Sequence, residues 1–381
     1  MAEREEENQR LLAGIRSWVE IESPSTDAEA VNRMVSLVEA DLDGAGLETE
    51  RVTGRDGFGD HLLARTPWDT NEPGIMVLGH LDTVWSMGTL DLRPFRVEGG
   101  KAYGPGIYDM KGGAYLICEA IKIIMGESRL EGGSPPPLPI TVVLVSDEEV
   151  GSPTSREIIE EEAKRAKYVL VFEPARPPHG AAVTTRSGWG RFRIRVRGRA
   201  AHAGSDHQLG RSAITEMARL IVKIESMTDY ERGVTFNVGT VQGGTRPNVV
   251  PEQAEADVDL RFANTGDAEE LEQAVLGLQP EGEDIEVEVF GGINRPPFER
   301  SEVGMALFER AKSVAADVGV DLKETWAGGV SDGNFAAALG VPTLDGLGVV
   351  GAGAHAETEH IVVDRLAERA DFLLGLLRSL D

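Results

Sequence analysis

The sequence predicts an α/β protein with a mainly parallel central sheet, interrupted by an inserted α+β domain. In the first half of the chain, short β-branched runs alternate with helical patterns, which is typical of a parallel sheet with helices on its faces. Near Ser187 the pattern changes to longer alternating strands, and the earlier pattern returns after Pro296. At 381 residues, the chain is also longer than one hydrophobic core usually grows. These three observations favour two domains.

Two helical patterns open the chain. Apolar residues recur at helical spacing from about 5 to 21 and again from about 29 to 45. We then expect three buried strands that end in polar residues: GIMVLGHLD from Gly74, ITVVLVSDEE from Ile140 and YVLVFEP from Tyr168. Between the first two strands, the apolar segment 112–125 is too long for a strand and predicts a helix.

The inserted domain is predicted to span residues 187–297. Residues 191–197 alternate apolar side chains with arginines, which is typical of a half-buried strand. The patterns that follow predict, in order, a helix, two strands, a helix and a strand at 212–226, 234–241, 255–262, 268–278 and 285–290. The first domain then comprises 1–186 and 298–381, and it ends in an amphipathic helix at about 363–380.

Composition and charge exclude several classes of partner. The formal net charge of -26 and the pI near 4.7 argue against nucleic acid and anionic membranes, because the field of the whole molecule repels polyanions. A single cysteine, Cys118, forbids an internal disulfide and favours the cytoplasm. The first residues are acidic and polar, unlike a signal peptide, and no stretch approaches the length of a membrane span. We therefore expect neither export by that route nor a membrane anchor.

Ionisable side chains follow the ends of the predicted strands. His80 and Asp82 follow the first strand, Glu148 and Glu149 follow the second, and Glu173 ends the third. In an open parallel sheet, ligands bind beyond the carboxyl ends of the strands. We therefore expect these five side chains to converge on one edge of the sheet.

Two further candidates, Asp109 and His355, lie in the glycine-rich segments GPGIYDMKGG and GAGAHAETEH. Crowded carboxylates repel one another unless cations are present. Histidine nitrogens mixed with carboxylate oxygens suit zinc, or cobalt and manganese in its place. Two histidines plus three carboxylates are more than one tetrahedral ion needs, so we predict two metal ions bridged by one carboxylate. Each residue alone would be more typical of a loop, a cap or a solvated acidic turn.

Five motifs occur in order over nearly the whole chain: GHLDTVW at 79–85, GPGIYDMKGG at 104–113, SDEEVGS at 146–152, FEPA at 172–175 and GAGAH at 351–355. Together they resemble the metallo-aminoacylase and glutamate carboxypeptidase family of dinuclear zinc peptidases, with the closest likeness to the glutamate carboxypeptidase branch. The resemblance implies a zinc-peptidase-like catalytic domain with an inserted ferredoxin-like domain that serves as a lid and in dimerisation.

The resemblance also implies a role for each candidate ligand. His80 and Glu173 would hold one metal ion, Glu149 and His355 would hold the other, and Asp109 would bridge the two. In that family the peptide bond after the bridging aspartate is commonly cis, so the same is implied for the bond that follows Asp109.

Two catalytic roles accompany the ligands. By the resemblance, Glu148 would be the general base, which takes a proton from the attacking water and returns it to the leaving nitrogen. From its place in the motif, Asp82 would accept a hydrogen bond from His80 and fix the ring for metal binding.

The inserted domain adds a second set of candidates. GRAAHAG at 198–204 resembles the lid motif of the family, whose histidine, here His202, reaches the active site of a partner subunit and stabilises the oxyanion. A homodimer through the lid is therefore implied. The substrate would be held by Asn248, Arg261, Arg295 and the backbone amide of Gly329. Arginine suits the carboxylate of a C-terminal amino acid because it forms paired hydrogen bonds. The same residues also have ordinary interpretations as turn, strand-end or linker positions.

The predicted function is hydrolysis of an amide bond that releases a C-terminal amino acid, with glutamate favoured, from a peptide or an N-acyl conjugate. One alternative keeps the chemistry and changes the substrate: an N-acyl-amino-acid deacylase of the acetylornithine or succinyl-diaminopimelate type. A hydrolase with one metal ion, or with manganese or cobalt, is a further alternative. A non-catalytic binding module of the same fold would have lost Glu148 or the ligands, and the intact set argues against it.

Overall fold

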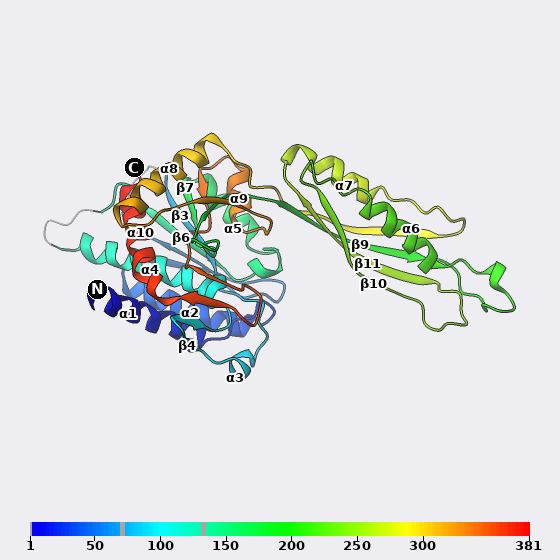
Figure 1. Cartoon of the computed structure of the whole chain (residues 1–381), viewed down its shortest axis with the longest axis horizontal. Helices are drawn as coiled ribbons and strands as arrows, with labels where there is room; N and C mark the ends of the chain where they lie inside the picture. The colour runs from blue at the N-terminus through cyan, green and yellow to red at the C-terminus, as the bar shows by residue number, and fades with distance from the viewer. Residues whose placement is uncertain (1, 69–72, 131–134) are drawn as a thin grey trace. The chain divides into compact units, whose positions relative to one another are not determined.

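The computed structural model describes residues 2–68, 73–130 and 135–381, and the chain forms two compact units (Figure 1). The first unit comprises Met1–Thr185, Arg300–Ala327 and Ser331–Asp381. The second unit comprises Arg186–Glu299 and Gly328–Val330. The sequence pattern does not indicate that residues 328–330 return to the second unit.

A six-stranded sheet forms the centre of the first unit, in the order β1-β2-β6-β3-β7-β14. Its strands are β1 (Glu48–Val52), β2 (His61–Arg65), β3 (Gly74–His80), β6 (Ile140–Val145), β7 (Ala166–Val171) and β14 (Thr343–Leu344). β3 pairs in parallel with β6 and with β7, and β14 pairs in parallel with β7. The β1–β2 and β2–β6 pairs are antiparallel. The predicted α/β class and mainly parallel central sheet are confirmed.

Helices cover both faces of this sheet (Figure 1). Alternate residues of β3 point to opposite faces, so Ile75 and Val77 pack in one core and Met76 and Leu78 in the other. The first core contains α1 (Ala2–Val19), α2 (Ala28–Gly44), α4 (Gly112–Ser128), α8 (Glu302–Asp317) and α10 (Leu366–Ser379). The second contains α5 (Arg156–Lys164) and α9 (Gly333–Ala338). Each fully buried aliphatic side chain contributes about 1.5–3 kcal/mol, so the two cores hold the strand ends in place.

Smaller elements surround the carboxyl edge of the sheet. A four-stranded sheet has the order β15-β16-β5-β4, with β4 (Arg96–Glu98), β5 (Lys101–Tyr103), β15 (Gly351–Ala352) and β16 (His360–Val362). β8 (Ala182–Arg186) pairs with β13 (Glu324–Ala327), and the remaining short helical turns are α3 (Thr89–Leu92), η1 (Ile107–Lys111), η2 (Glu148–Val150) and η5 (Val363–Arg365). Among the helices in the described part of the chain, none has the length and apolar character needed to cross a membrane.

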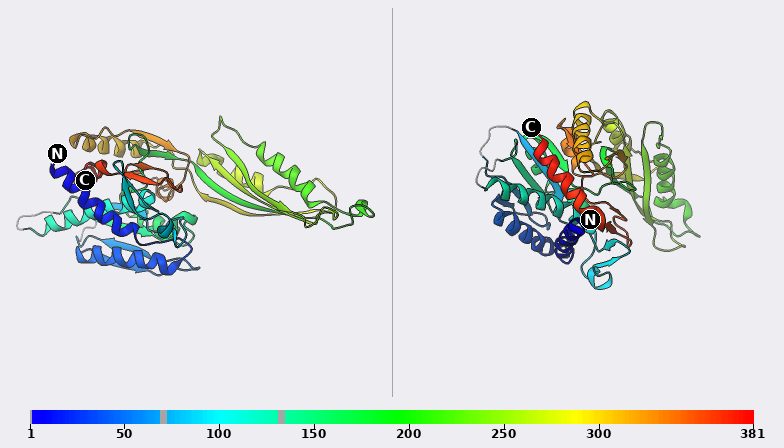
Figure 2. Two further views of the ribbon diagram at one scale, coloured as in Figure 1. Left: turned by 60° about the horizontal axis from the view of Figure 1, so that its bottom comes forward. Right: turned by 60° about the vertical axis from the view of Figure 1, so that its left-hand side comes forward.

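The second unit is a four-stranded antiparallel sheet with two helices on one face (Figures 1 and 2). Its elements along the chain are β9 (Gly188–Arg197), η3 (His207–Leu209), α6 (Ala213–Glu225), β10 (Thr235–Gly243), β11 (Gln253–Phe262), η4 (Thr265–Asp267), α7 (Ala268–Leu276) and β12 (Glu286–Arg295). The sheet order is β10-β11-β9-β12, which is the ferredoxin-like arrangement of a βαββαβ chain. The helices and strands predicted for this segment are therefore confirmed.

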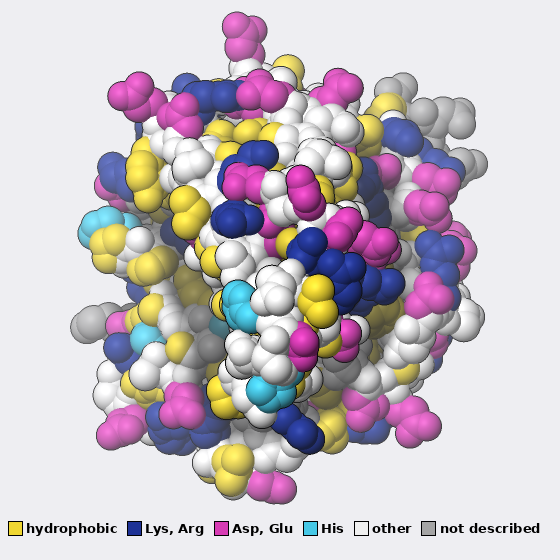
Figure 3. Space-filling model, turned by 90° about the vertical axis from the view of Figure 1, so that its right-hand side faces the viewer, with side chains coloured by type: hydrophobic (Ala, Val, Ile, Leu, Met, Phe, Trp, Pro, Cys, Tyr) yellow, Lys and Arg dark blue, Asp and Glu magenta, His cyan; other side chains and the backbone are white. Residues whose placement is uncertain are grey.

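The other face of the second sheet carries charged side chains. Cross-strand pairs join Arg193 Nε to Asp257 Oδ1 at 2.9 Å and Arg195 Nε to Glu255 Oε2 at 2.6 Å. On the side of the molecule drawn in Figure 3, Lys and Arg side chains lie beside Asp and Glu side chains. Exposed pairs of this kind contribute about 0–1 kcal/mol each, so they add little to the stability of the sheet.

Candidate metal centre

The parallel strands bring the predicted ligands to one edge of the first unit. His80 is the last residue of β3, Glu149 lies in η2 directly after β6, and Glu173 follows β7. Because β3, β6 and β7 run in parallel, their carboxyl ends meet at the same edge. Together with Asp109 and His355, these side chains form two groups, and within each group the ligand atoms lie within 4.8 Å of one another.

The first group contains His80, Asp109 and Glu173. Nε2 of His80 lies 3.3 Å from Oδ1 of Asp109 and 3.7 Å from Oε1 of Glu173. The side chains of His80 and Glu173 are only 1% and 8% exposed, so water competes little for their polar atoms.

The second group contains Asp109, Glu149 and His355. Nε2 of His355 lies 3.3 Å from Oδ2 of Asp109 and 3.1 Å from Oε2 of Glu149. The His355 side chain is 52% exposed, and its backbone has a φ of 61° in the loop between β15 and β16. Asp109 therefore belongs to both groups and presents one carboxylate oxygen to each histidine.

The charges of this cluster attract cations. Burial alone disfavours a protonated His80, but contacts with Asp109 and Asp82 raise its pKa. Hydrogen bonds with Asp109 and Glu149 raise the pKa of His355 to about 11. Burial alone would raise the pKa of Asp109, yet its contacts with the two histidines hold that pKa below the ordinary value. Burial raises the pKa of Glu149. A divalent cation would compete with protons for these ring nitrogens and carboxylates.

The donor set fits divalent metal ions. Two imidazoles and three carboxylates are the nitrogen and oxygen ligands that zinc, cobalt and manganese accept. In addition, Oε1 of Glu149 is buried and accepts no hydrogen bond from any residue in the described part of the chain. A buried carboxylate oxygen without a donor is costly unless a cation contacts it. We therefore regard the five side chains as a candidate site for two metal ions.

Asp82 contacts more partners than the sequence suggested. The closest acceptor for Nδ1 of His80 is the backbone carbonyl of Asp82 at 3.0 Å, whereas Oδ1 of the Asp82 carboxylate lies 3.5 Å away. The fully buried carboxylate instead accepts hydrogen bonds from the backbone amides of Glu148 and Glu149 at 3.3 and 3.2 Å and from the Ser25 hydroxyl at 2.6 Å. Asp82 therefore orients the ring mainly through its backbone, and its side chain holds the turn that carries Glu148.

Glu148 begins the η2 turn and is half-buried. Contacts with Asp109 and Asp82 are the main causes of the raised pKa of His80, and the negative charge of Glu148 adds to them. Behind it, Asp147 accepts hydrogen bonds from the Thr154 amide and hydroxyl, each at 2.7 Å, and from the Ser155 hydroxyl at 2.5 Å. This buried network fixes the turn on which both glutamates sit.

The loop that carries Asp109 is held by a residue that sequence reasoning missed. The Asp109–Met110 peptide bond is cis, as the resemblance implied. Glu359, which is 3% exposed, accepts hydrogen bonds from the backbone amides of Gly106, Tyr108 and Asp109 and from a tryptophan side chain. Burial raises the pKa of Glu359 to about 7 despite these donors. The sequence signal for it was weak, because Glu359 follows His355 in an acidic loop where a solvated carboxylate is the ordinary expectation.

With this geometry established, comparison with known proteins identifies the family. The family model described as peptidase family M20/M25/M40 matches residues 76–379. The chain belongs to this family. The M20 chain is accordingly an enzyme that hydrolyses peptide or acyl–amino acid bonds.

The relatives of this chain include a carboxypeptidase and a desuccinylase. Carboxypeptidase G2 of Pseudomonas sp. (strain RS-16) is 31% identical over 383 residues, which cover 98% of this chain and 90% of that protein. Succinyl-diaminopimelate desuccinylase of Acinetobacter baumannii (strain AYE) is 26% identical over 343 residues, which cover 86% of this chain and 88% of that protein. A solved M20 family metallo-carboxypeptidase from Sulfolobus solfataricus matches with a TM-score of 0.75 at 16% identity, covering 97% of this chain and 98% of that one, which shows a common fold.

The predicted substrate residues of the M20 chain belong to the second unit, whereas the metal ligands belong to the first. Arg261 lies on β11, where its guanidinium pairs with Asp259 at 2.8 and 3.1 Å and lies 5.5 Å from the ring centroid of Trp189. Arg295 ends β12, is 1% exposed, and donates a hydrogen bond to the Asn294 side chain at 3.1 Å. Arg261 thus already has a carboxylate partner within its own strand.

His202 and Asn248 lie in neighbouring loops of the second unit. The amide of Ala203 donates to the backbone carbonyl of Asn248 at 3.0 Å. In addition, His202 forms an isolated antiparallel β-bridge with Val249, the residue after Asn248. Both residues are exposed. The carbonyl of Gly329 accepts a hydrogen bond from the buried Arg186 at 2.9 Å. The structure therefore brings His202 and Asn248 together. Arg261 and Arg295 lie elsewhere in this unit, both opposite Trp189 of the central strand β9. Gly329 lies next to Arg186.

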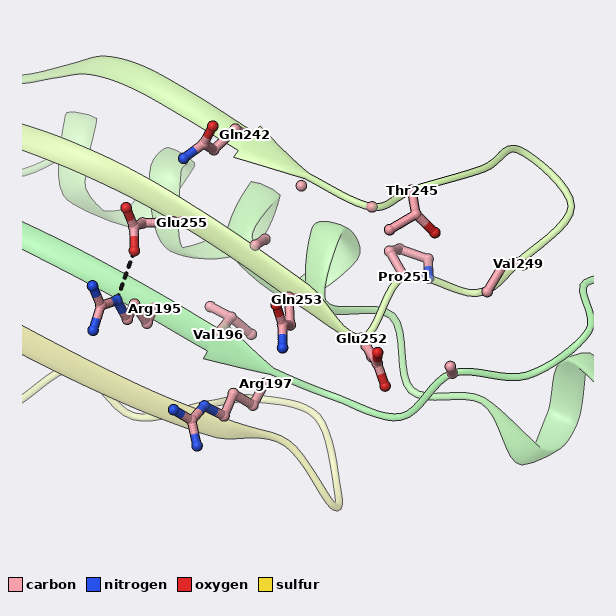
Figure 4. Close-up of a pocket in the computed structure, with 14 residues that line it drawn as sticks. Arg195, Val196, Arg197, Gln242, Thr245, Val249, Pro251, Glu252, Gln253 and Glu255 are labelled. Carbon is pink, nitrogen blue, oxygen red and sulfur yellow. Dashed lines mark hydrogen bonds and ion pairs between the residues drawn. The ribbon is translucent and has the colours of Figure 1, made fainter.

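A hollow of about 550 Å³ lies next to the loop that carries Asn248 (Figure 4). It is lined by the ends of β9, β10 and β11, and Arg195 forms its ion pair with Glu255 at one side. All the residues that line this hollow belong to the second unit, whereas the five candidate ligands belong to the first.

Proposed function

We propose that this chain is a dinuclear-metal carboxypeptidase that releases a C-terminal amino acid, of the glutamate type, from a peptide or N-acyl conjugate. The observation that carries the proposal is the pair of ligand groups that share Asp109, with Glu148 on the adjoining turn. The identity of 31% with carboxypeptidase G2 supports the choice of substrate class.

In this proposal, His80 and Glu173 would hold one ion, Glu149 and His355 would hold the other, and Asp109 would contact both. Zinc is the proposed metal, with cobalt or manganese as functional replacements, because the ligands are imidazole and carboxylate. When bound, the two ions would supply Lewis acidity for the activation of water and of the scissile carbonyl group.

Glu148 is the proposed general base. It removes a proton from the attacking water and then donates that proton to the leaving nitrogen. The position of Glu148 supports this role, because its backbone amide is fixed by the buried carboxylate of Asp82 at 3.3 Å. Asp82 contributes by orienting both the His80 ring and this turn.

His202 is the proposed oxyanion donor, and its hydrogen bonds support the assignment. The amides of Gly204 and Ser205 both donate to Nδ1 of His202 at 3.1 Å. Since Nδ1 accepts, the proton of the neutral ring lies on Nε2, which is then available as a hydrogen-bond donor. We propose that this donor acts in the active site of a partner subunit, in a homodimer formed through the second unit.

The remaining groups are proposed to bind the carboxylate of the released amino acid. Arg261 and Arg295 offer paired N–H donors, and Asn248 and the amide of Gly329 add uncharged ones. The partner would be a small peptide or N-acyl amino acid. We also propose a cytoplasmic setting, supported by the single buried cysteine, Cys118.

A second candidate is an N-acyl-amino-acid deacylase. The identity of 26% with succinyl-diaminopimelate desuccinylase over 86% of this chain favours it. Both candidates share the same ligands and base, so they differ in the groups that recognise the two sides of the amide bond.

A panel of substrates separates the two candidates. The zinc-loaded protein is assayed with folate-like glutamate conjugates, N-acetylornithine and N-succinyl-diaminopimelate, and kcat/KM is measured for each. We expect the glutamate conjugates to have the highest kcat/KM. A preference for either N-acyl substrate by tenfold or more would replace the carboxypeptidase assignment with the deacylase one, and hydrolysis of none would reject both.

A further inference from the structure

Glu359 is a buried carboxylate that receives four N–H donors. Its Oε1 accepts from the amides of Tyr108 and Asp109 at 2.9 and 3.1 Å, and its Oε2 accepts from the amide of Gly106 at 3.0 Å and from Nε1 of Trp85 at 2.8 Å. Since the side chain is 3% exposed, these donors replace water almost completely. Charge-assisted hydrogen bonds of this kind are stronger than those between neutral groups.

The strand register explains how Glu359 reaches this loop. β15 and β16 form a hairpin that has His355 in its connecting loop and Glu359 directly before β16. β16 pairs with β5, with His360 opposite Tyr103. The chain leaves β5 toward Gly106 and Asp109, so Glu359 lies beside the start of the Asp109 loop. Glu359 therefore joins the hairpin that carries His355 to the loop that carries Asp109.

We propose that Glu359 is a positioning residue that ties the His355 hairpin to the Asp109 loop and thereby sets the metal group of Asp109, Glu149 and His355. This inference rests on the proposed dinuclear function. Its effect is local, because the other ligands have their own supports: His80 ends a central strand, and the amide of Glu149 is fixed by Asp82. His355, half-exposed in a hairpin loop, depends on the hairpin for its place.

The two metal groups therefore respond differently to the loss of Glu359. In Glu359→Gln the shape is kept, but one carboxylate oxygen becomes an amide group that faces two N–H donors, so one side of the contact is broken. The group of Asp109, Glu149 and His355 loses its geometry, whereas the group of His80, Asp109 and Glu173 keeps two ligands on strand ends. Loss of a residue that orients ligands typically weakens metal binding by about 10–100-fold.

The test is a titration of the metal-free protein with Co²⁺, followed by visible absorption and by competition with a chelator of known affinity. The wild-type chain, Glu359→Gln and the control Glu357→Gln are compared; Glu357 lies in the same loop and is exposed. We expect two bound ions in all three proteins, with one of the two weakened by about 10–100-fold only in Glu359→Gln. Far-ultraviolet circular dichroism checks that metal-free Glu359→Gln is folded. If this variant does not fold, Glu359→Asp, which keeps the charge, is titrated in its place.

Two results would overturn the inference: unchanged affinity for both ions, or an equal loss at both, which indicates a general structural defect. The proposed function fails separately. If the wild-type chain binds two Co²⁺ ions but hydrolyses no substrate, the hydrolase assignment is rejected while the role of Glu359 in metal binding stands. If the wild-type chain binds no Co²⁺, both are rejected.

Discussion

The two units of this chain differ in how their candidate functional groups are held. In the first unit, five side chains distant in sequence converge within two groups, because they follow parallel strands or lie in loops anchored to them. In the second unit, the predicted substrate groups are spread over two loops and two strand ends, and Arg261 already pairs with Asp259. On the proposed function, the metal ligands are therefore brought together by the fold of one unit, whereas the proposed substrate groups are not prearranged to the same degree.

The two units also differ in how the charges of their carboxylates are balanced. In the candidate metal centre of the first unit, the carboxylates of Asp109 and Glu149 lie beside histidines of the same site, and a bound cation would balance their charge. On the sheet of the second unit, carboxylates lie opposite arginines, as Asp257 does opposite Arg193, and the charge is balanced within the sheet. Changes to the candidate ligands or to Glu148 should therefore alter metal binding or the chemical step, whereas changes to Asn248, Arg261 or Arg295 should alter KM.

The largest effect is expected from Glu148→Gln. Removal of a general base typically lowers kcat by about 10²–10⁴-fold, whereas the five ligands are untouched. We expect kcat to fall by that factor and the metal content, measured by inductively coupled plasma mass spectrometry, to stay at two ions per chain. Glu161→Gln is the matched control, because Glu161 is exposed on α5 in the same unit. Activity of the Glu148 variant within tenfold of the wild type would contradict its role as the base.

A smaller but distinctive effect is expected from His355→Ala. This change removes one ligand from the group that also contains Asp109 and Glu149, so we expect the metal content to fall from two ions to one per chain. His360→Ala is the control, since His360 lies five residues further along the same hairpin, belongs to neither ligand group, and has its Nδ1 2.8 Å from the carbonyl oxygen of Thr358. Retention of two tightly bound ions by His355→Ala would break the assignment of this group.

The difference between the units also explains which parts could be predicted from sequence. The convergence of the candidate ligands could be predicted because His80 and Glu173 stand at the ends of predicted strands, and a parallel sheet brings such ends to one edge. The contacts of the Asp82 and Glu359 carboxylates with backbone amides were not predicted, because they join segments far apart in the sequence. Asp82 is 66 residues from Glu148, and Glu359 is 251 residues from Tyr108. No local pattern encodes such contacts, which depend on strand register and loop packing.

The smallest effect, and the sharpest test of the second unit, is expected from Arg261→Lys. Lysine keeps the positive charge but loses the paired N–H donors of the guanidinium. If Arg261 binds the substrate carboxylate, one charge-assisted hydrogen bond is lost, worth about 1.5 kcal/mol, so KM should rise by about tenfold with kcat nearly unchanged. Steady-state kinetics with a glutamate conjugate measures both constants.

Arg193→Lys provides the control for this measurement, because Arg193 also lies on the sheet of the second unit and pairs with an aspartate, Asp257, at 2.9 Å. Its substitution should leave KM unchanged. An equal and small change in both variants would mean that the pair of Arg261 with Asp259 serves the sheet, as the pair on β9 does. In that case the substrate carboxylate is bound by Asn248, Arg295 or Gly329 instead. The proposed preference for glutamate is then weakened, whereas the proposed metal-dependent hydrolysis is unaffected.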